Sequence, residues 1–351
     1  MRFRTLLWLA LLAILASCTR DQAPAPLTLD ELRARASQVE GLESLAIWHR
    51  GSVLLEIYLE GDADDLRDVR SVTKSLTSVL VGIAIDQELL PSAEQPLALT
   101  LGRHGLPASA LSSEIRLRHL LTMSAGLDWD DREDISLYQA WRASSNPVHF
   151  YLDRPATSAP GEDFVYASPA PHVLGAVIEE ASGVSLPDFA QSHLFSALGI
   201  SEVSWQALDD RQTNAGGALR IRTMDLLRIG RLVLDNGRWQ DRDIVSRDWI
   251  AESTRMHIRL RDDFGYGYLW WISDGPPVRV VMGQGFGGQS LVVVPEWQLV
   301  AVSTSRWRRI SQHTAEQQAR SVQTFFLQDL APLIAGLEGM SSASGTATSG
   351  D

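Results

Sequence analysis

The sequence predicts an α/β protein of the α+β type, with one antiparallel sheet, helices on its faces and an all-helical part inserted into it. β-rich segments occur near both ends of the chain, within 45–58 and 266–304, and the residues between them, about 91–239, form helical patterns interrupted by Pro and Gly. Strands from both ends that enclose a helical middle are typical of one sheet built from both termini. With 351 residues, 45% of them hydrophobic, the chain is long enough to bury a large core.

The first segment of the chain reads as a secretory signal. Basic residues precede an apolar run over 6–16, which is shorter than the roughly 20 residues that span a bilayer. The run ends in Leu15-Ala16-Ser17-Cys18, which resembles a bacterial lipobox. We therefore expect a signal peptide over 1–17, a lipid on Cys18 and a tether over 18–28.

This resemblance implies a protein anchored by lipid to the bacterial envelope. Thr19 follows the cysteine, where Asp would imply retention in the inner membrane, so the outer membrane facing the periplasm is favoured. The alternative is a simple signal with an incidental cysteine. Cys18 is the single cysteine, which excludes a disulfide framework and a cysteine-based structural zinc site.

The body of the chain, 29–340, is expected to form one domain. A short helix over 29–39 precedes a hairpin, and an apolar pattern with helical spacing then predicts a largely buried helix over 71–90. The sheet part is expected at about 29–90 and 240–340 and the helical part at about 91–239. A Ser-, Gly-, Ala- and Thr-rich tail over 341–351 is expected to be disordered.

Further elements follow from the same periodicities. Helices are predicted over 116–123, 171–182, 186–198, 223–236 and 314–337. Strands are predicted over 266–272, 278–282, 289–294 and 299–304.

The charge of the chain argues against a nucleic-acid partner. It has 43 acidic and 31 basic residues, a net charge of −12, and no basic block that would bind phosphates. Of the 31 basic residues, Lys74 is the single lysine and the others are arginines. Arginine can replace lysine where a positive charge suffices, but lysine alone readily loses its proton. Lys74 is therefore a candidate for chemistry.

The run Ser71-Val72-Thr73-Lys74 opens the predicted buried helix. Residues three apart lie one turn apart on a helix, so the Ser71 hydroxyl and the Lys74 amine can meet. The N–H groups at a helix N-terminus can stabilise an oxyanion, and burial lowers the pKa of a lysine so that it can act as a base. The alternative is a capping serine beside a surface lysine.

Two further segments offer partners for this pair. Tyr166-Ala167-Ser168 lies in a turn before a predicted helix, and a phenol beside a lysine can serve as a general acid or base. The segment 283–289 carries four glycines between two strands. It matches GxGxxG by letter, but a strand follows it rather than a helix, so dinucleotide binding is excluded. Glycines on a strand instead allow a substrate to approach the backbone.

Other polar residues are expected to be structural. No His spacing of a metal site occurs, and no Gly-x-Ser-x-Gly elbow supports a Ser-His-Asp triad. The acidic cluster Asp128, Asp130 and Asp131 is interpreted as a solvated loop rather than a cation site. We expect neither a metal nor a cofactor.

Taken together, these motifs resemble the serine β-lactamase and penicillin-binding-protein superfamily. Within it, the chain is similar to the class C-like serine hydrolases, a branch that includes 6-aminohexanoate-dimer hydrolase and related esterases. The resemblance covers most of the mature chain and includes 117–129, 160–162, 215–219, 237–239 and 266–271. It implies a β-lactamase-like fold.

The resemblance also implies roles for residues of this chain. Ser71 would be the acylated nucleophile, Lys74 its general base and Tyr166 the group that relays a proton to the leaving group. The backbone N–H groups of Ser71 and Phe286 would form the oxyanion hole, with Ser168 and Gly285 in contact with substrate.

Two departures bear on the substrate. Ser168 stands where the family has Asn, and Gly283 stands where the family has the lysine that helps to hold a substrate carboxylate in β-lactamases and DD-peptidases. The sequence therefore predicts a serine hydrolase that cleaves a small-molecule carboxylic ester or linear amide. The alternatives are a β-lactamase or DD-peptidase, and a catalytically inactive binding lipoprotein. The sequence leaves the oligomeric state open.

Overall fold

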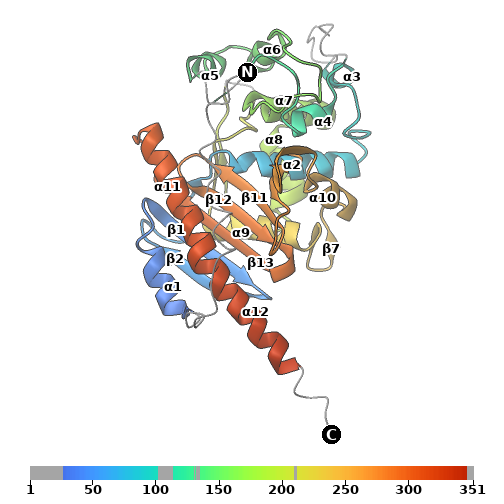
Figure 1. The fold of residues 1–351 in the computed structure, drawn as a ribbon. Helices are drawn as coiled ribbons and strands as arrows, with labels where there is room; N and C mark the ends of the chain where they lie inside the picture. The colour runs from blue at the N-terminus through green and yellow to red at the C-terminus, as the bar shows by residue number, and fades with distance from the viewer. Residues whose placement is uncertain (1–26, 102–113, 130, 132–134, 209–211, 346–351) are drawn as a thin grey trace.

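The centre of the molecule is an antiparallel sheet of eight strands, seen in the computed structural model in Figure 1. The structure describes residues 27–101, 114–129, 131, 135–208 and 212–345. The strand order is β2-β1-β13-β12-β11-β10-β9-β8, so the N-terminal hairpin extends the sheet beside the last strand. The strands are β1 (Leu42–His49), β2 (Ser52–Tyr58), β8 (Ile258–Arg261), β9 (Phe264–Tyr266), β10 (Trp271–Ser273), β11 (Val280–Gly285), β12 (Gln289–Val294) and β13 (Leu299–Ser305).

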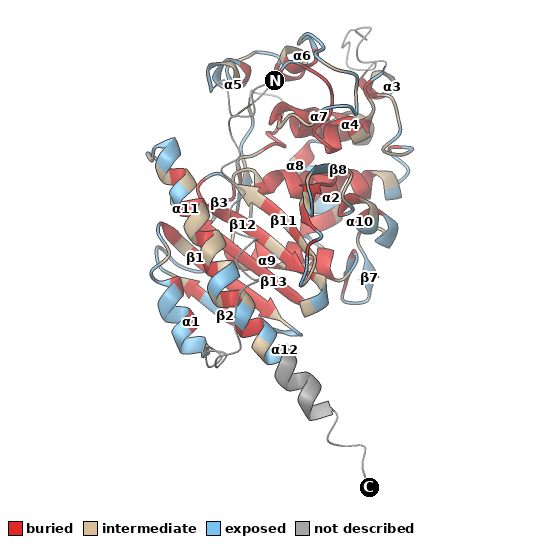
Figure 2. Ribbon diagram, in the orientation of Figure 1, coloured by how far each residue is buried: buried red, intermediate tan, exposed pale blue. Residues whose placement is uncertain are grey.

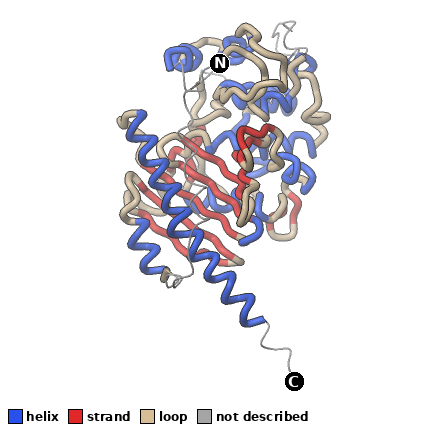
Figure 3. The backbone as a smooth tube through the Cα atoms, viewed as in Figure 1, coloured by secondary structure: helices blue, strands red, loops and turns tan. Residues whose placement is uncertain are grey.

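Helices cover both faces of this sheet. On one face lie α1 (Leu29–Ala36), α11 (Gln312–Phe325), a π-helical turn η5 (Phe326–Leu330) and α12 (Ala331–Gly345). The continuous run of α11, η5 and α12 crosses the sheet diagonally in Figures 1 and 3. Their apolar residues share a buried cluster with β1 and β13. On the other face, α9 (Thr223–Leu234) and α2 (Val72–Asp86) contribute to a second and larger cluster. The two clusters explain the buried interior in Figure 2.

Helix α2 joins the sheet to the helical part of the molecule. It lies between them in Figure 1, and every residue from Val72 to Ala84 is buried. The helical part contains α3 (Leu97–Leu101), α4 (Leu117–Leu121), α5 (Ile135–Arg142), α6 (Pro147–Leu152), α7 (Pro169–Ser182), α8 (Leu186–Ala190) and the π-helical turn η3 (Gln191–Phe195). A helix that is buried on all sides is the expected centre of such an arrangement.

Smaller elements complete the fold. They are β3 (Arg67–Asp68), β4 (Ser204–Trp205), β5 (Leu219–Ile221), β6 (Arg238–Trp239), β7 (Arg242–Asp243), α10 (Arg247–Ser253) and the 3-10 turn η4 (Pro295–Trp297). Strands β3, β5 and β4 form a small antiparallel sheet, with β3 lying just before α2. The N-terminal end of α2 thus lies between this small sheet and strand β11 of the central sheet, which also contacts α2.

The structure confirms the predicted fold class and corrects some elements. The single strand predicted over 266–272 is two strands, β9 and β10, because the chain turns between them. Leu269 has a φ of +62°, and its N–H donates to the Leu121 carbonyl at 2.8 Å. Helix α12 continues to Gly345, into the segment expected to be a disordered tail.

Two expectations concern the membrane. The predicted signal peptide, Cys18 and most of the tether lie outside the described residues. Within the part of the chain that the structure describes, every helix is too short or too polar to span a bilayer.

Candidate active site

Ser71 stands at the N-cap position of α2, at the point where the chain leaves β3. The preceding residue, Arg70, has a φ of +50°, a conformation that is uncommon outside glycine and is typical of functional sites. Within the described residues, the Ser71 side chain caps none of the first N–H groups of the helix. The hydroxyl of Ser71 is therefore not used as a helix cap, and the residue is only partly buried.

Lys74 lies one turn further along α2 and is 1% exposed. Its Nζ is 2.9 Å from the Ser71 Oγ, 3.0 Å from the Ser168 Oγ and 2.6 Å from the Gly216 carbonyl oxygen. The interpretation of Lys74 as a surface charge is therefore excluded. Gly216 was not predicted as a site residue, although the segment around it carried part of the family resemblance.

These three partners fit both protonation states of the lysine. The ammonium form has three N–H donors and finds three oxygen acceptors. In the neutral form, one N–H of the Lys74 amine still donates to the Gly216 carbonyl, because a carbonyl oxygen can only accept a hydrogen bond. The lone pair can then accept the proton of the Ser71 hydroxyl. The arrangement therefore permits proton transfer from Ser71 to Lys74 without movement of either residue.

Burial makes the neutral form accessible near neutral pH. Desolvation lowers the pKa of Lys74 from its ordinary value of 10.5 to about 7. The negative charge of Asp131 opposes this shift, and the positive charge of Arg70 adds to it. A buried lysine with such a pKa is a candidate base, because a base is most effective when its pKa lies near the working pH.

Tyr166 lies beside Lys74 at the end of an aromatic stack. The Lys74 Nζ is 5.2 Å from the centroid of the Tyr166 ring. Trp271 is stacked on Tyr166 at 5.9 Å between centroids, and Phe264 is stacked on Trp271 at 5.6 Å. The three rings run from the lysine to strands β9 and β10 of the sheet. Trp271 therefore supports Tyr166.

Ser168 and Asp131 meet at the N-terminal end of α7. The carboxylate of Asp131 accepts hydrogen bonds from the Ser168 N–H at 2.9 Å and from the Trp129 indole at 2.6 Å. Asp128 is exposed and ion-paired with Arg154, and Asp130 lies outside the described residues. The interpretation of this segment as a solvated loop is therefore wrong for Asp131. Periodicity gave no signal for this contact, because it joins residues 37 apart in the sequence.

The glycines of β11 allow the strand to pack closely against the start of α2. A Cβ at Gly283 would lie 2.8 Å from the Ser75 Oγ, and one at Gly285 would lie 2.6 Å from the Val69 carbonyl oxygen. Both distances are shorter than carbon–oxygen contacts allow. Phe286 follows in the turn between β11 and β12 and is 39% exposed. This turn is thus brought close to the segment that carries Ser71.

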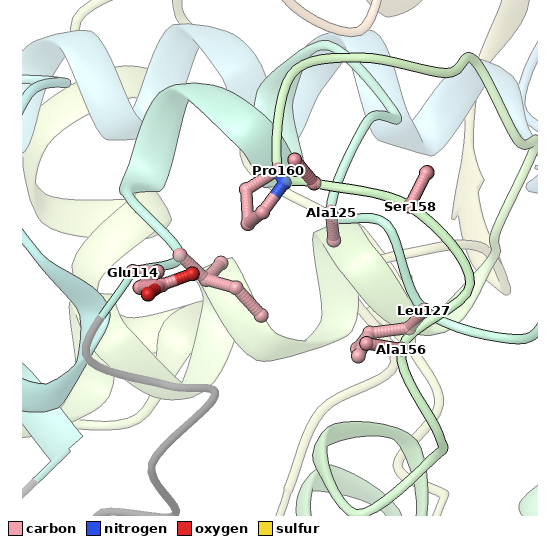
Figure 4. A pocket seen from close by; sticks show the side chains of 8 residues that line it. Glu114, Ala125, Leu127, Ala156, Ser158 and Pro160 are labelled. Atoms are coloured by element: carbon pink, nitrogen blue, oxygen red, sulfur yellow. The ribbon is translucent and has the colours of Figure 1, made fainter.

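A small cavity lies away from this centre, in the helical part (Figure 4). Its volume is about 70 Å³, and Figure 4 shows Ala125 and Leu127 on one loop and Ala156, Ser158 and Pro160 on another, with Glu114 opposite. Pockets for drug-sized ligands typically enclose about 300–1,000 Å³. This cavity is therefore too small to be the substrate site.

Comparison with known proteins decides the family. The family model described as Beta-lactamase matches residues 32–321, which is most of the chain. The chain belongs to the Beta-lactamase family. Membership confirms the superfamily predicted from the sequence and makes the protein a hydrolase.

A relative of known sequence and several solved structures are similar to this chain. The chain is 25% identical to 6-aminohexanoate-dimer hydrolase of Paenarthrobacter ureafaciens in an alignment of 332 residues that covers 85% of this chain and 83% of that protein. A candidate 6-aminohexanoate-dimer hydrolase from Bacillus anthracis has a similar structure, with a TM-score of 0.74 and 17% identity over 89% of this chain and 83% of that one. A family VIII carboxylesterase has a TM-score of 0.66 and 14% identity over 84% and 96% of the two chains. These last two similarities concern the fold.

Proposed function

We propose that this member of the Beta-lactamase family hydrolyses carboxylic esters or linear amides through an acyl-enzyme on Ser71. The observation that supports this most directly is the 2.9 Å contact between the Ser71 Oγ and the Nζ of a buried Lys74 whose pKa is lowered to about 7. Such a pair combines a nucleophile with a base that can be neutral at the working pH.

In the proposed acylation step, neutral Lys74 accepts the hydroxyl proton of Ser71 while the Oγ attacks the carbonyl carbon of the substrate. A new C–O bond forms, and the carbonyl oxygen becomes an oxyanion. The N–H groups of Ser71 and Phe286 are the proposed donors to this oxyanion, and loss of one such donor typically costs about 100- to 1,000-fold in rate.

Collapse of this intermediate releases the alcohol or amine. Tyr166 is the proposed relay, which passes the proton from Lys74 to the leaving group. Water then attacks the acyl carbon and gives one proton back through the same groups, so that Ser71 is regenerated and a carboxylic acid leaves. The proposal requires neither a metal nor a cofactor.

The substrate class is inferred from the residues that the site lacks. Gly283 supplies no positive charge for a substrate carboxylate, and Ser168, which is bonded to Lys74, replaces an amide side chain. Both features favour an ester or linear amide over penicillins and D-Ala-D-Ala ends. The named activities of the amide- and ester-cleaving relatives agree with this preference.

Substitution of the nucleophile tests the proposal. Ser71→Ala is expected to abolish both cleavage of a p-nitrophenyl ester and labelling by a fluorophosphonate probe, whereas Ser52→Ala, at the exposed first residue of β2, should change neither. Normal turnover in Ser71→Ala would contradict the proposal. Nitrocefin cleavage well above ester cleavage would favour a β-lactamase, and a folded wild-type protein without labelling would favour a binding protein.

We also propose that the protein is anchored to the bacterial envelope through a lipid on Cys18, facing the periplasm from the outer membrane. The proposal rests on the lipobox-like sequence before this cysteine. Cys18→Ala should move the protein from the membrane fraction to the soluble fraction. Continued sedimentation of this variant with membranes would contradict a lipid anchor at Cys18.

A further inference from the structure

Asp131 is attached to both ends of the Tyr166-Ala167-Ser168 segment. Its own N–H donates to the Tyr166 carbonyl at 3.3 Å, and its carboxylate accepts the Ser168 N–H at 2.9 Å. The indole N–H of Trp129 binds the other carboxylate oxygen at 2.6 Å. The segment that carries two neighbours of Lys74 is therefore fixed by one residue.

The position of Asp131 is itself supported from behind. Trp129 makes edge-to-face contacts with Trp141, Phe150 and Tyr151, so the indole that holds the carboxylate is fixed in an aromatic cluster. The carboxylate also lies at the N-terminal end of α7, where the helix dipole stabilises a negative charge. Both features favour an ionised and well-ordered Asp131.

Among the described residues, few charged groups act on this part of the molecule. Lys74 is affected by Asp131 and Arg70, and the Tyr166 ring lies against its amine. The carboxylate of Asp131 is affected by Lys74, and it in turn affects the phenols of the partly buried Tyr138 and the buried Tyr151. Burial raises the pKa of Asp131, whereas Lys74 and the bonds from Ser168 and Trp129 lower it.

We propose that Asp131 is a positioning residue that holds the Tyr166-Ala167-Ser168 segment against Lys74 and supplies the counter-charge to the ammonium formed when Lys74 takes the proton of Ser71. This proposal rests on the proposed function of the site. In a buried site, a positive charge that appears during the reaction needs a fixed negative partner, because water cannot reorganise around it. Asp131 provides that partner without contacting the substrate.

The lone lysine of the chain allows a direct test. Protein grown with lysine labelled by ¹³C at the ε carbon gives one lysine side-chain signal, so its NMR titration reports Lys74 alone. Asp131→Asn is expected to lower the midpoint of this titration by about 1 pH unit, the usual effect of losing a nearby opposite charge. Asp128→Asn is the matched control, because it removes an exposed carboxylate from the same segment, and its midpoint should equal that of the wild type.

The kinetic counterpart uses p-nitrophenyl ester cleavage. In Asp131→Asn, the acidic limb of the kcat/KM profile should move to lower pH by the same amount as the NMR midpoint of Lys74. The rate at the alkaline plateau should fall about tenfold, since a weaker base corresponds to a smaller rate. Asp131→Glu keeps the charge but lengthens the side chain. It should keep a midpoint close to that of the wild type and lower kcat through displacement of Tyr166 and Ser168.

These outcomes separate the inference from the proposed function. An unchanged midpoint in folded Asp131→Asn, or wild-type kcat in Asp131→Glu, would overturn the role of Asp131 while leaving Ser71 chemistry intact. If Asp131→Asn does not fold, Asp131→Glu still decides the positioning role. If the wild type cleaves no ester and is not labelled at Ser71, the proposed function fails, and the role of Asp131 in the reaction fails with it.

Discussion

The Nζ of Lys74 and the Oγ of Ser71 lie 2.9 Å apart, one turn apart on a helix that is buried along almost its whole length. The contact explains why a chain whose other basic residues are all arginines has a lysine here. Arginine keeps its proton at any pH that a folded protein tolerates, so it cannot accept the proton of a serine.

Lys74→Arg is therefore expected to be almost as damaging as Ser71→Ala. General-base catalysis typically contributes about 100- to 10,000-fold, and kcat/KM for a p-nitrophenyl ester should fall within this range. Arg242→Lys, in the exposed β6–β7 hairpin, is the control for an exchange between the two basic residues. Most of the activity surviving in Lys74→Arg would show that the position needs only a positive charge.

The pH dependence of the wild type should show the titration of Lys74. Because burial lowers the pKa of this amine to about 7, kcat/KM should rise as the pH increases through about 7 and then level off. Below this pH the amine is protonated and cannot take the proton of Ser71. Kinetics from pH 5 to 9, with a substrate whose own ionisation is constant, check this limb. A flat profile would contradict Lys74 as the base.

The same lowered pKa predicts a conflict between activity and stability. The unfolded chain keeps the Lys74 proton up to about pH 10.5, whereas the folded chain loses it at about 7. Between these values the unfolded state binds more protons, so the stability of the wild type should rise with pH. Lys74→Met removes the buried amine, so it should abolish activity yet raise the melting temperature at pH 6 by several degrees, since about 1 kcal/mol corresponds to roughly 2–4 °C in a large domain.

The stability gain of Lys74→Met should shrink as the pH approaches 10, because the wild type then no longer has to discharge the lysine on folding. Thermal melts of both proteins from pH 6 to 10 check the sign and the trend. A gain that does not change with pH would mean that packing, rather than the charge, limits stability at this position.

Much of this arrangement could be predicted from the sequence, and the reasons are physical. Helical spacing of Ser71 and Lys74 determines that they lie on one face, and the apolar pattern of α2 determines that this helix is buried. The contacts of Asp131 and Gly216 could not be predicted. Gly216 contacts Lys74 and Asp131 contacts Ser168, and in both pairs the two residues are far apart in the sequence. Gly216 and Asp131 also lie in turns, which have no periodic pattern.

The aromatic stack provides a fourth prediction. Trp271 lies between Tyr166 and Phe264, so its loss should let the Tyr166 ring tilt away from Lys74. Trp271→Leu should lower kcat by at least about tenfold, because small displacements of a reacting group have large effects on rate. Trp271→Phe keeps a ring in the stack and should lose less.

Trp297→Leu is the control for this substitution, because Trp297 lies in η4 and packs with the cluster on the opposite face of the sheet. It should lower the melting temperature and leave kcat of the folded protein unchanged. Equal loss of kcat in the two Trp→Leu variants would mean that general destabilisation, rather than the stack, accounts for the effect.

The glycines of β11 support a last prediction, which concerns the absent family lysine. A Cβ at Gly285 would meet the Val69 carbonyl at 2.6 Å and the Arg70 Cβ at 3.0 Å, which are backbone and near-backbone atoms that cannot rotate away. At Gly283 the nearest atom is the Ser75 Oγ, at 2.8 Å, and a hydroxyl can change rotamer. Gly285→Ala should therefore destabilise the protein more than Gly283→Ala, each by about 1–3 kcal/mol.

Gly217→Ala serves as the control for both glycine variants, since its Cβ would meet neighbours only at 3.8 and 3.9 Å. Denaturant titrations of the three variants give the order. Gly283→Lys, which restores the family lysine, should gain no nitrocefin activity, because its side chain would have to displace the side chains of Ser75 and Val72 in α2, whose nearest atoms lie 2.8 and 3.2 Å from the new Cβ. Appreciable nitrocefin turnover in Gly283→Lys would instead show that the missing charge alone sets the substrate preference.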